Sequence, residues 1–518
     1  MTYFIRDAYN QPSETPQSFP SELESGLQLI EKAYEENRLA AIQGPPGAGK
    51  TTVIFEGITR LSKQLDEDEV ILYISPTNKL IFDLLIRFNR HELKYIVDKS
   101  TTRVYGSFNY SGYEELSRPL NHDTKLVLAT EFQRIHATAE IFKSSGKRLI
   151  ILYDEGGKSP LYRLFGPIAD ALLKGRGSNK VSSLVVVGDP QQAISLTEDL
   201  RLSKNKALLM TRAIVSMIRE IDPSLADSVE NNEERLEIAL NKVRKSLSLF
   251  HMLEYTFRVP GPSHEIISTG FYDGGLKAKF EFRHRAITVK GKIPKCLNSL
   301  TTSEAQQIEN AINSGIGIIY LHDKSGKSYR DSDENVDKLR LRYSVDVAVL
   351  LAALTGLDTV ILSPYRDMYT YTNLYLRLYY TKCDPHQKKV QVGTVSQWIG
   401  SESTNAVLVL GKEHLPDSWN HSQINSYLTI YFNEPELFNV QFSRHKGVMV
   451  VIGNVENLQK SAQKILKHYS NPKLKPKESA DKNIYSLNAS VIQKVSEKLS
   501  DMCSNGNSKS CEKILIRG

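Results

Sequence analysis

The sequence predicts an α/β fold with two successive doubly wound parallel sheets. Short apolar, β-rich runs alternate with helix-like segments from about residue 25 to 195, and the same alternation returns from about 315 to 454. A strand of a parallel sheet is apolar on both faces because helices cover both sides of the sheet. Two arrays of this kind in one chain favour two α/β domains in tandem.

The individual strands are visible as apolar runs bounded by turn formers or charged segments. In the first array they read LAAIQG, VILYIS, KLVLAT, RLIILYDE and SLVVVGD, and in the second GIGIIYLH, TVILSPY, VQVGTV, NAVLVLG and GVMVVIGN. Helical patterns such as SVDVAVLLAALTG lie between them. We expect each run to be a buried strand, with helices between successive strands.

These arrays divide the chain into three predicted parts. The first domain is residues 1–245, with an accessory insert at about 92–124 and a polar, helix-friendly segment at about 196–245. The second domain is residues 246–458. Residues 459–518 are Lys-rich and contain Pro and Ser, so we predict a basic, partly disordered tail with one helix.

Composition is that of a soluble globular protein. The 518 residues are 40% hydrophobic and 24% charged, which excludes a mainly disordered chain and a coiled-coil rod. No uninterrupted apolar run approaches the ~18 residues of a membrane helix, and the first residues lack the apolar core of a signal peptide. We therefore expect an intracellular, soluble protein of the cytoplasm or nucleus, with no membrane partner.

The net charge of +7 is carried by the C-terminal tail. Residues 460–518 hold twelve Lys or Arg and five Asp or Glu, so the preceding residues are neutral by formal count. Net charge alone therefore gives no argument for nucleic-acid binding by the main body.

Cysteine usage predicts free thiols. The chain has four cysteines, none of them in CxxC spacing: Cys296, Cys383, Cys503 and Cys511. We expect neither a disulfide framework nor a structural zinc module.

A phosphate-binding loop follows the first apolar run. The motif G-x-x-x-x-G-K-T stands between a strand and a helix, the setting that it needs to cradle phosphates with backbone N–H groups. Lys50 is expected to reach the β- and γ-phosphates of ATP, and the Thr51 hydroxyl to hold Mg²⁺. The predicted nucleotide-binding residues of this loop are Gly44, Pro45, Pro46, Gly47, Ala48, Gly49, Lys50, Thr51 and Thr52.

Polar residues end two later strands of the same array. Asp154 and Glu155 follow LIILY, and we expect Asp154 to hold Mg²⁺ and Glu155 to polarise the attacking water. Gln192 follows the next strand in GDPQQ, where a neutral amide can contact the γ-phosphate and sense its loss.

Taken in order, these motifs resemble those of superfamily 1 helicases, in the up-frameshift-like branch. The double proline in QGPPGAGKT, then SPTN, YDEGG and GDPQQ, carry the resemblance in the first array. The second array continues it with Phe257-Arg258-Val259-Pro260, Phe271–Leu276, Ser363–Arg366, Gly393–Val395 with Glu402, and Asn439–Arg444. The resemblance extends from about residue 25 to 454.

By that resemblance, two RecA-like domains clamp one ATP between them. Arg258 and Arg444 would act as arginine fingers from the second domain, which is chemically reasonable because charge develops on the γ-phosphate in the transition state. Glu402 would hold the ribose. The Phe257 ring would stack on the adenine.

The resemblance also implies contacts to single-stranded DNA or RNA. The family uses short polar groups at strand ends to hold sugar and phosphate without reading sequence. The corresponding residues are Pro76, Thr77, Asn78, Thr130, Ser363, Tyr365 and Thr394. The activity implied is a helicase or translocase moving 5′-to-3′. The alternatives are a nucleic-acid-stimulated ATPase that remodels complexes without processive unwinding, and a P-loop scaffold, which the complete set of catalytic residues disfavours.

The sequence departs from the family pattern at several points. Ser396, Trp398 and Ile399 replace the family's Asp, Phe and Gln, so coupling between ATP and the strand is in question. Only 43 residues precede Gly44, so the β-barrel that most members carry there is missing, and the insert at about 92–124 is a candidate replacement.

Overall fold

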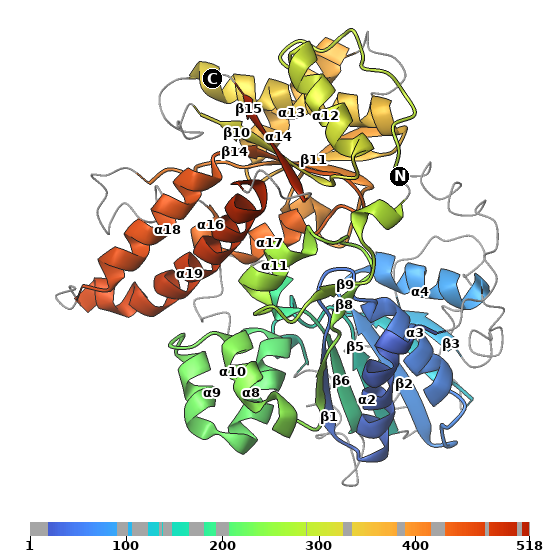
Figure 1. Cartoon of the computed structure of the whole chain (residues 1–518). Helices are drawn as coiled ribbons and strands as arrows, with labels where there is room; N and C mark the ends of the chain where they lie inside the picture. Colours follow the sequence, from blue (N-terminus) through green and yellow to red (C-terminus); the bar gives the residue numbers. More distant parts are fainter. Residues whose placement is uncertain are drawn as a thin grey trace.

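The computed structural model describes residues 19–90, 102–105, 123–133, 137, 148–164, 181–192, 207–285, 287–324, 334–380, 389–415, 430–471, 476–504 and 510–516. Two all-parallel sheets form separate α/β units within this part of the chain (Figure 1). In the part of the chain that is described, no helix combines the length and the apolar character that a membrane crossing requires.

The first sheet has seven parallel strands in the order β3-β4-β2-β5-β6-β1-β7. Successive residues of its central strands enter opposite cores: Val70, Leu72 and Ile74 pack on one side, and Ile71 and Tyr73 on the other. This burial on both faces explains the apolar runs in the sequence. The strands are β1 (Leu39–Gln43), β2 (Glu69–Ser75), β3 (Thr102–Tyr105), β4 (Leu126–Thr130), β5 (Arg148–Tyr153), β6 (Val181–Gly188) and β7 (Phe250–Met252), and helices α2 (Glu24–Glu35), α3 (Lys50–Leu61) and α4 (Asn78–Arg90) belong to the same unit.

The polar segment at about 196–245 contains three helices where it is described. They are α8 (Leu209–Ile221), α9 (Pro223–Glu230) and α10 (Leu236–Val243). The turn between α8 and α9 is fixed by Asp222, whose side chain accepts from the backbone N–H of Leu225. In Figure 1 these helices lie beside the first sheet.

The second sheet has six parallel strands in the order β12-β11-β13-β14-β10-β15. The strands are β10 (Ile318–Asp323), β11 (Thr359–Ser363), β12 (Val390–Thr394), β13 (Asn405–Val409), β14 (Met449–Gly453) and β15 (Cys511–Ile516). Their helices are α12 (Thr302–Asn313), α13 (Glu334–Thr355), α14 (Arg366–Tyr380), α16 (Ile430–Asn433), α17 (Glu436–Phe442), α18 (Val455–Tyr469) and α19 (Pro476–Ser504). Helix α12 begins with a capping box between Thr301 and Glu304.

The segment that joins the two sheets starts later than predicted. We placed the boundary at residue 245, but β7 (Phe250–Met252) pairs with β1 and is the edge strand of the first sheet. The short pair β8 (Tyr255–Thr256) and β9 (Lys277–Ala278) and helix α11 (His264–Phe271) then lead towards the second sheet.

The prediction of a partly disordered tail over 459–518 is wrong for the residues described. Helices α18 and α19 lie side by side, and β15 pairs with β10 along its full length as an edge strand of the second sheet (Figure 1). The tail is therefore part of the second domain. The prediction rested on the many charged residues of this segment. Those residues alternate with apolar positions that are buried, such as Ile492, Val495 and Leu499 in α19.

The prediction of free thiols is also wrong. Cys503, at the end of α19, and Cys511, at the start of β15, form a disulfide. Cys296 is disulfide-bonded as well, and Cys383 lies outside the described residues. The two cysteines come together because the chain turns back between α19 and β15. A search for CxxC spacing cannot recognise such a pair.

The insert predicted at about 92–124 is described only in part. Thr102–Tyr105 form β3, which pairs in parallel with β4 and extends the first sheet at its edge. These four residues therefore belong to the sheet and not to an accessory unit. The segments 91–101 and 106–122 lie outside the described residues.

Candidate active site

The glycine-rich loop lies between β1 and α3, as the motif requires. Gly47 and Gly49 have φ angles of +69° and +87°, a backbone conformation that residues with a side chain rarely adopt. The turn directs Lys50 back over the loop, where its Nζ donates to the carbonyl of Gly44 at 2.8 Å. Burial lowers the pKa of Lys50, and the nearby carboxylates of Glu155 and Asp189 oppose this effect.

Asp154 and Glu155 stand where β5 ends. The carboxylate of Asp154 is buried and accepts from the Tyr73 hydroxyl at 2.9 Å and from the backbone N–H of Glu155 at 2.8 Å. Burial, together with the neighbouring Glu155, raises the pKa of Asp154 to about 6.

Glu155 has the opposite electrostatic environment. Its carboxylate pairs with the ammonium of Lys158 at 2.9 Å. Burial would raise its pKa, but Lys158 and Lys50 outweigh burial and lower the pKa of Glu155 to about 2. The backbone of Glu155 has a φ of +53°, a conformation that is costly outside glycine and that occurs at functional sites. The pKa values of the two acids are therefore shifted in opposite directions, and only Glu155 has a left-handed backbone conformation.

The donors present suit a magnesium ion. Thr51 lies in the first turn of α3 and Asp154 at the end of β5, which parallel pairing brings to the same edge of the sheet. Mg²⁺ prefers oxygen ligands and commonly uses one or two protein groups together with substrate phosphates. One hydroxyl and one carboxylate next to a phosphate-binding loop match that pattern.

Asp189, directly after β6, the strand next to β5, holds a hydrogen-bonded cluster. Its Oδ2 accepts from the Gln192 amide and from the Tyr272 hydroxyl, both at 2.6 Å. Tyr272 in turn accepts from Asn439 Nδ2 at 2.8 Å, and the same nitrogen donates to the carbonyl of Gln191 at 2.8 Å. Asn439 belongs to α17 of the second domain, so this cluster joins the two units.

Arg444 reaches the same cluster from the second domain. It is 1% exposed, and its guanidinium donates to the carbonyls of Val440 at 2.9 Å and Ser401 at 3.1 Å. Its Nη2 donates to Gln192 Oε1 at 3.1 Å. Burial lowers the pKa of Arg444 to about 9, and repulsion by the nearby Arg258 adds to this effect. The cation is thus held by carbonyl groups and directed at the predicted γ-phosphate sensor.

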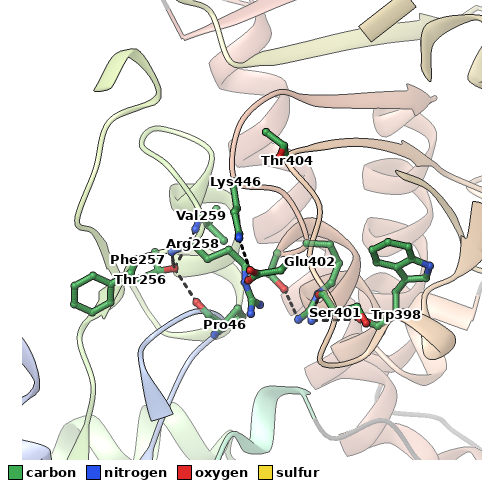
Figure 2. Close-up of polar contacts among 12 residues, drawn as sticks. Pro46, Thr256, Phe257, Arg258, Val259, Trp398, Ser401, Glu402, Thr404 and Lys446 are labelled. Atoms are coloured by element: carbon green, nitrogen blue, oxygen red, sulfur yellow. Dashed lines mark hydrogen bonds and ion pairs between the residues drawn. The ribbon is translucent and has the colours of Figure 1, made fainter. Parts of the chain in front are cut away.

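Arg258 approaches from a different direction than the resemblance implies. Its segment docks on the phosphate loop, where the backbone N–H of Phe257 donates to the Gly47 carbonyl at 2.9 Å. Figure 2 shows the second contact, in which the Thr256 hydroxyl donates to the Pro46 carbonyl at 2.8 Å. A side chain at Gly47 would lie 2.3 Å from the Arg258 Cβ, which leaves room only for glycine. Arg258 therefore belongs to the joining segment beside the loop, and only Arg444 comes from the second sheet.

Glu402 of the second domain pairs with Arg258 of the joining segment. Figure 2 shows its carboxylate between Arg258, whose Nε lies at 2.7 Å, and the ammonium of Lys446. Burial raises the pKa of Glu402, but Arg258 and Lys446 outweigh burial and lower it. Phe257 is half-buried against the core of the first domain.

The residues predicted to contact a nucleic-acid strand fall into two groups, one at each sheet. In the first, Thr130 at the end of β4 is register partner of Ser75, which directly precedes Pro76, Thr77 and Asn78. In the second, Ser363 at the end of β11 is register partner of Thr394 at the end of β12, and Tyr365 follows Ser363. The side chains of Thr130 and Ser363 are buried, whereas Thr77 is exposed.

Packing accounts for two departures from the family pattern. The Trp398 ring lies over Gly393, where an added Cβ would be 2.1 Å from the indole. The Trp398 carbonyl accepts from Arg444, and Ile399 packs on the large core. The segment that lacks the family's polar side chains therefore still contacts the arginine through its backbone.

Several residues of the site were missed in the sequence. Tyr73 and Lys158 contact Asp154 and Glu155 of the predicted set. Asp189 and Gln191, which neighbour the predicted Gln192 in the chain, were missed together with their partners Tyr272 and Glu237. His445, next to Arg444 in the chain, was missed as well. His445 is buried and shares a 2.7 Å hydrogen bond with Ser263. Tyr272 lies in the Phe271–Leu276 motif, but no neighbouring residue in the sequence indicates that its hydroxyl contacts Asp189.

Comparison with known proteins gives one family match, to a model described as an AAA domain, over residues 24–148. This span contains the phosphate loop and α3. No curated protein matches the chain.

Among solved structures, two crystal structures of the DUF1998 helicase MrfA are similar to this chain. The one bound to DNA and AMPPNP is 11% identical with a TM-score of 0.37, covering 98% of this chain and 65% of that one. The one bound to DNA is 12% identical with a TM-score of 0.35, covering 88% and 56%. The chain thus spans less than two thirds of either protein, and TM-scores below 0.5 support no conclusion about the fold. The family match over residues 24–148 thus shows similarity to an AAA domain in the part of the first α/β unit that carries the glycine-rich loop.

Proposed function

We propose that this protein hydrolyses ATP in the cleft between its two α/β domains and uses the energy to move along single-stranded DNA or RNA in the 5′-to-3′ direction. One observation carries the proposal: Arg444 of the second domain donates to Gln192 of the first, beside the phosphate loop. An arginine delivered by a second domain can act only when the cleft is closed, which links hydrolysis to domain movement.

In this proposal the first domain binds the nucleotide and prepares the water. The loop from Gly44 to Thr52 holds the phosphates, and Lys50 neutralises the β- and γ-phosphate charge. Glu155, kept ionised by Lys158 and Lys50, accepts the proton of the attacking water. Thr51 and Asp154 would hold Mg²⁺, which would supply positive charge beside the phosphates.

The second domain and the joining segment complete the site. Arg444 and Arg258 stabilise charge on the γ-phosphate, and Gln192 reports the loss of that phosphate. Glu402 would exchange its ion pairs for the ribose, and Phe257 would stack on the adenine.

Strand binding would use the loops after β2 and β4 in the first domain and after β11 and β12 in the second. These segments contain short polar residues, and short polar groups and backbone suit sugar and phosphate without reading sequence. Closing and opening of the cleft would change the spacing between the two loop pairs by moving one domain against the other.

The first test measures ATP turnover with and without single-stranded DNA and RNA. Strand-stimulated turnover is expected, and turnover insensitive to both polymers would contradict the proposal. Duplexes with a 5′ or a 3′ single-stranded tail then report direction: we expect separation of the 5′-tailed duplex alone. Stimulated turnover without separation of either duplex would favour the remodelling ATPase.

A further inference from the structure

An aromatic ring is exposed to solvent just beyond β4. Phe132 is 67% exposed, the largest exposed fraction among the large apolar side chains of the described residues. Single exposed apolar residues are common on protein surfaces, so exposure by itself indicates little. The surroundings of this ring distinguish it.

A guanidinium group is fixed over the ring. The Arg163 Cζ lies 4.7 Å from the ring centroid of Phe132. Arg163 forms an ion pair with Glu131, which is 3% exposed. Glu131 is held in turn by the Ser159 hydroxyl at 2.9 Å and the Tyr153 hydroxyl at 3.2 Å. A buried carboxylate with three donors therefore sets the position of a flat cation on one face of the ring, and the ring remains largely open to solvent.

The position of Phe132 on the sheet indicates which ligand its ring would contact. Phe132 follows Thr130 at the carboxyl end of β4, and β4 neighbours β2, which leads into Pro76–Asn78. The nucleotide elements lie further along the sheet, after β5, β6 and β1. Tyr162, next to Arg163 in the chain, is 60% exposed. An exposed aromatic ring and a fixed guanidinium thus stand next to a loop that we assign to the sugar–phosphate backbone.

We propose that Phe132, supported by Arg163, is a stacking site for one unpaired base of the bound strand. This inference rests on the proposed function, since it names a contact with the same substrate. A base has an apolar π-face whatever its identity, so an aromatic ring beside a phosphate-binding loop gives affinity without sequence preference. The Arg163 charge is already balanced by Glu131, so the site would recognise the base and not the phosphate.

The test compares oligonucleotides with and without bases. Binding of a fluorescent oligothymidylate of about 16 nucleotides is measured by anisotropy, beside an abasic oligomer with the same number of phosphates. Phe132→Ala is expected to weaken binding of the oligothymidylate by about 5- to 100-fold, the range of one lost base stack, and to leave binding of the abasic oligomer unchanged. A matched oligouridylate measures the same effect for RNA.

Two variants serve as controls. Phe132→Trp keeps a flat ring and should retain the affinity of the wild type. Ile221→Ala removes another exposed apolar side chain, 42% exposed at the end of α8, and should change neither affinity. The thermal unfolding temperature of each variant checks that the fold is intact.

The outcomes separate this inference from the proposed function. If the wild type binds the oligonucleotides but Phe132→Ala binds them equally well, or loses affinity for intact and abasic oligomers alike, the stacking site is wrong and strand binding stands. If the wild type binds no single strand, strand binding and the stacking site both fail.

Discussion

The two domains use the edges of their parallel sheets differently. In the first domain, the phosphate loop, Asp154 and Asp189 follow the carboxyl ends of β1, β5 and β6, and the predicted strand loops follow β2 and β4 at the same edge. In the second domain the predicted strand loops also follow carboxyl ends, those of β11 and β12. Glu402 and Arg444, however, stand before the amino ends of β13 and β14.

This difference suggests a division of labour. In the first domain, nucleotide and strand would share one rigid edge. In the second they would lie at opposite edges, separated by strands of five residues, or about 16 Å. A rotation of the second domain that brings Arg444 towards the phosphates would therefore displace its strand loops. The following changes test whether the first domain mainly binds nucleotide and the second mainly couples hydrolysis to movement of the strand loops.

The largest effect is expected at the phosphate loop. Lys50→Ala should reduce ATP turnover to background, because it removes the cation that neutralises the β- and γ-phosphates. Steady-state ATPase assays at saturating strand check this, with exposed Lys63→Ala as the control. Turnover near that of the wild type would place the nucleotide elsewhere.

Arg444→Ala tests the contribution of the second domain. We expect kcat to fall by about 10³-fold or more, with ATP affinity changed only a few-fold, because a finger acts mainly in the transition state. Nucleotide binding by fluorescence titration and turnover are measured together, and unfolding temperature is compared because the side chain is buried. Equal losses in affinity and turnover would make Arg444 a ground-state contact.

Glu155→Gln tests the predicted base. The amide preserves shape but cannot take a proton, so turnover should fall by about 10²- to 10⁴-fold while ATP still binds. Binding of labelled ATP and single-turnover hydrolysis distinguish the two steps. Loss of ATP binding would instead assign Glu155 to the metal or to the fold.

Tyr272→Phe tests the hydrogen bonds that join the domains. Removing the hydroxyl breaks its contacts with Asp189 and Asn439, and a hydrogen bond contributes about 1 kcal/mol, so strand-stimulated turnover should fall by roughly fivefold. Basal turnover should change less. Tyr34→Phe, which removes a hydroxyl bound to Glu69 away from the cleft, is the control. A similar loss in both variants would indicate general destabilisation.

The last change affects stability and is expected to have the smallest effect on turnover; it lies in the helical segment beside the first sheet. Glu237 of α10 accepts from Gln43 at 3.2 Å and from Gln191 at 2.5 Å, and burial raises its pKa to about 7, from an ordinary value of 4.5. A raised carboxyl pKa means that the folded state holds the proton more tightly. The wild type therefore loses stability as the pH rises from about 4.5 to 7.

Glu237→Gln should remove that pH dependence. We expect the variant to be more stable than the wild type by about 1–3 kcal/mol at pH 7 and equally stable below pH 4.5, as measured by urea unfolding. The buried Gln43 Oε1 has no partner, so that amide can turn to accept from the new side chain. A variant less stable than the wild type at pH 7 would show that the ionised carboxylate supports the fold.

The sequence was sufficient for structural features that depend on consecutive residues. The phosphate loop, with its Gly47 and Gly49, and the acids after β5 were predicted because strand, turn and side chains are neighbours in the chain. Both sheets were predicted as parallel because strands that are buried on both faces appear in the sequence as continuous apolar runs.

Other features depended on contacts between distant segments. The chain signals β15 weakly, since CEKILI is short and carries two charges, and its place beside β10 depends on a return through α18 and α19. Its disulfide has the same origin.

The sequence by itself determined the conformation of the glycine-rich loop and the class of the fold, because backbone preference and the burial pattern of each strand depend on residues that are neighbours in the chain. Tertiary structure alone decided how the halves meet. Tyr272 lies 83 positions from Asp189 and 167 from Asn439, and Arg444 lies 252 from Gln192. A hydrogen bond between such residues depends on angle and distance to within a few tenths of an ångström, and only the packing of the two domains sets these.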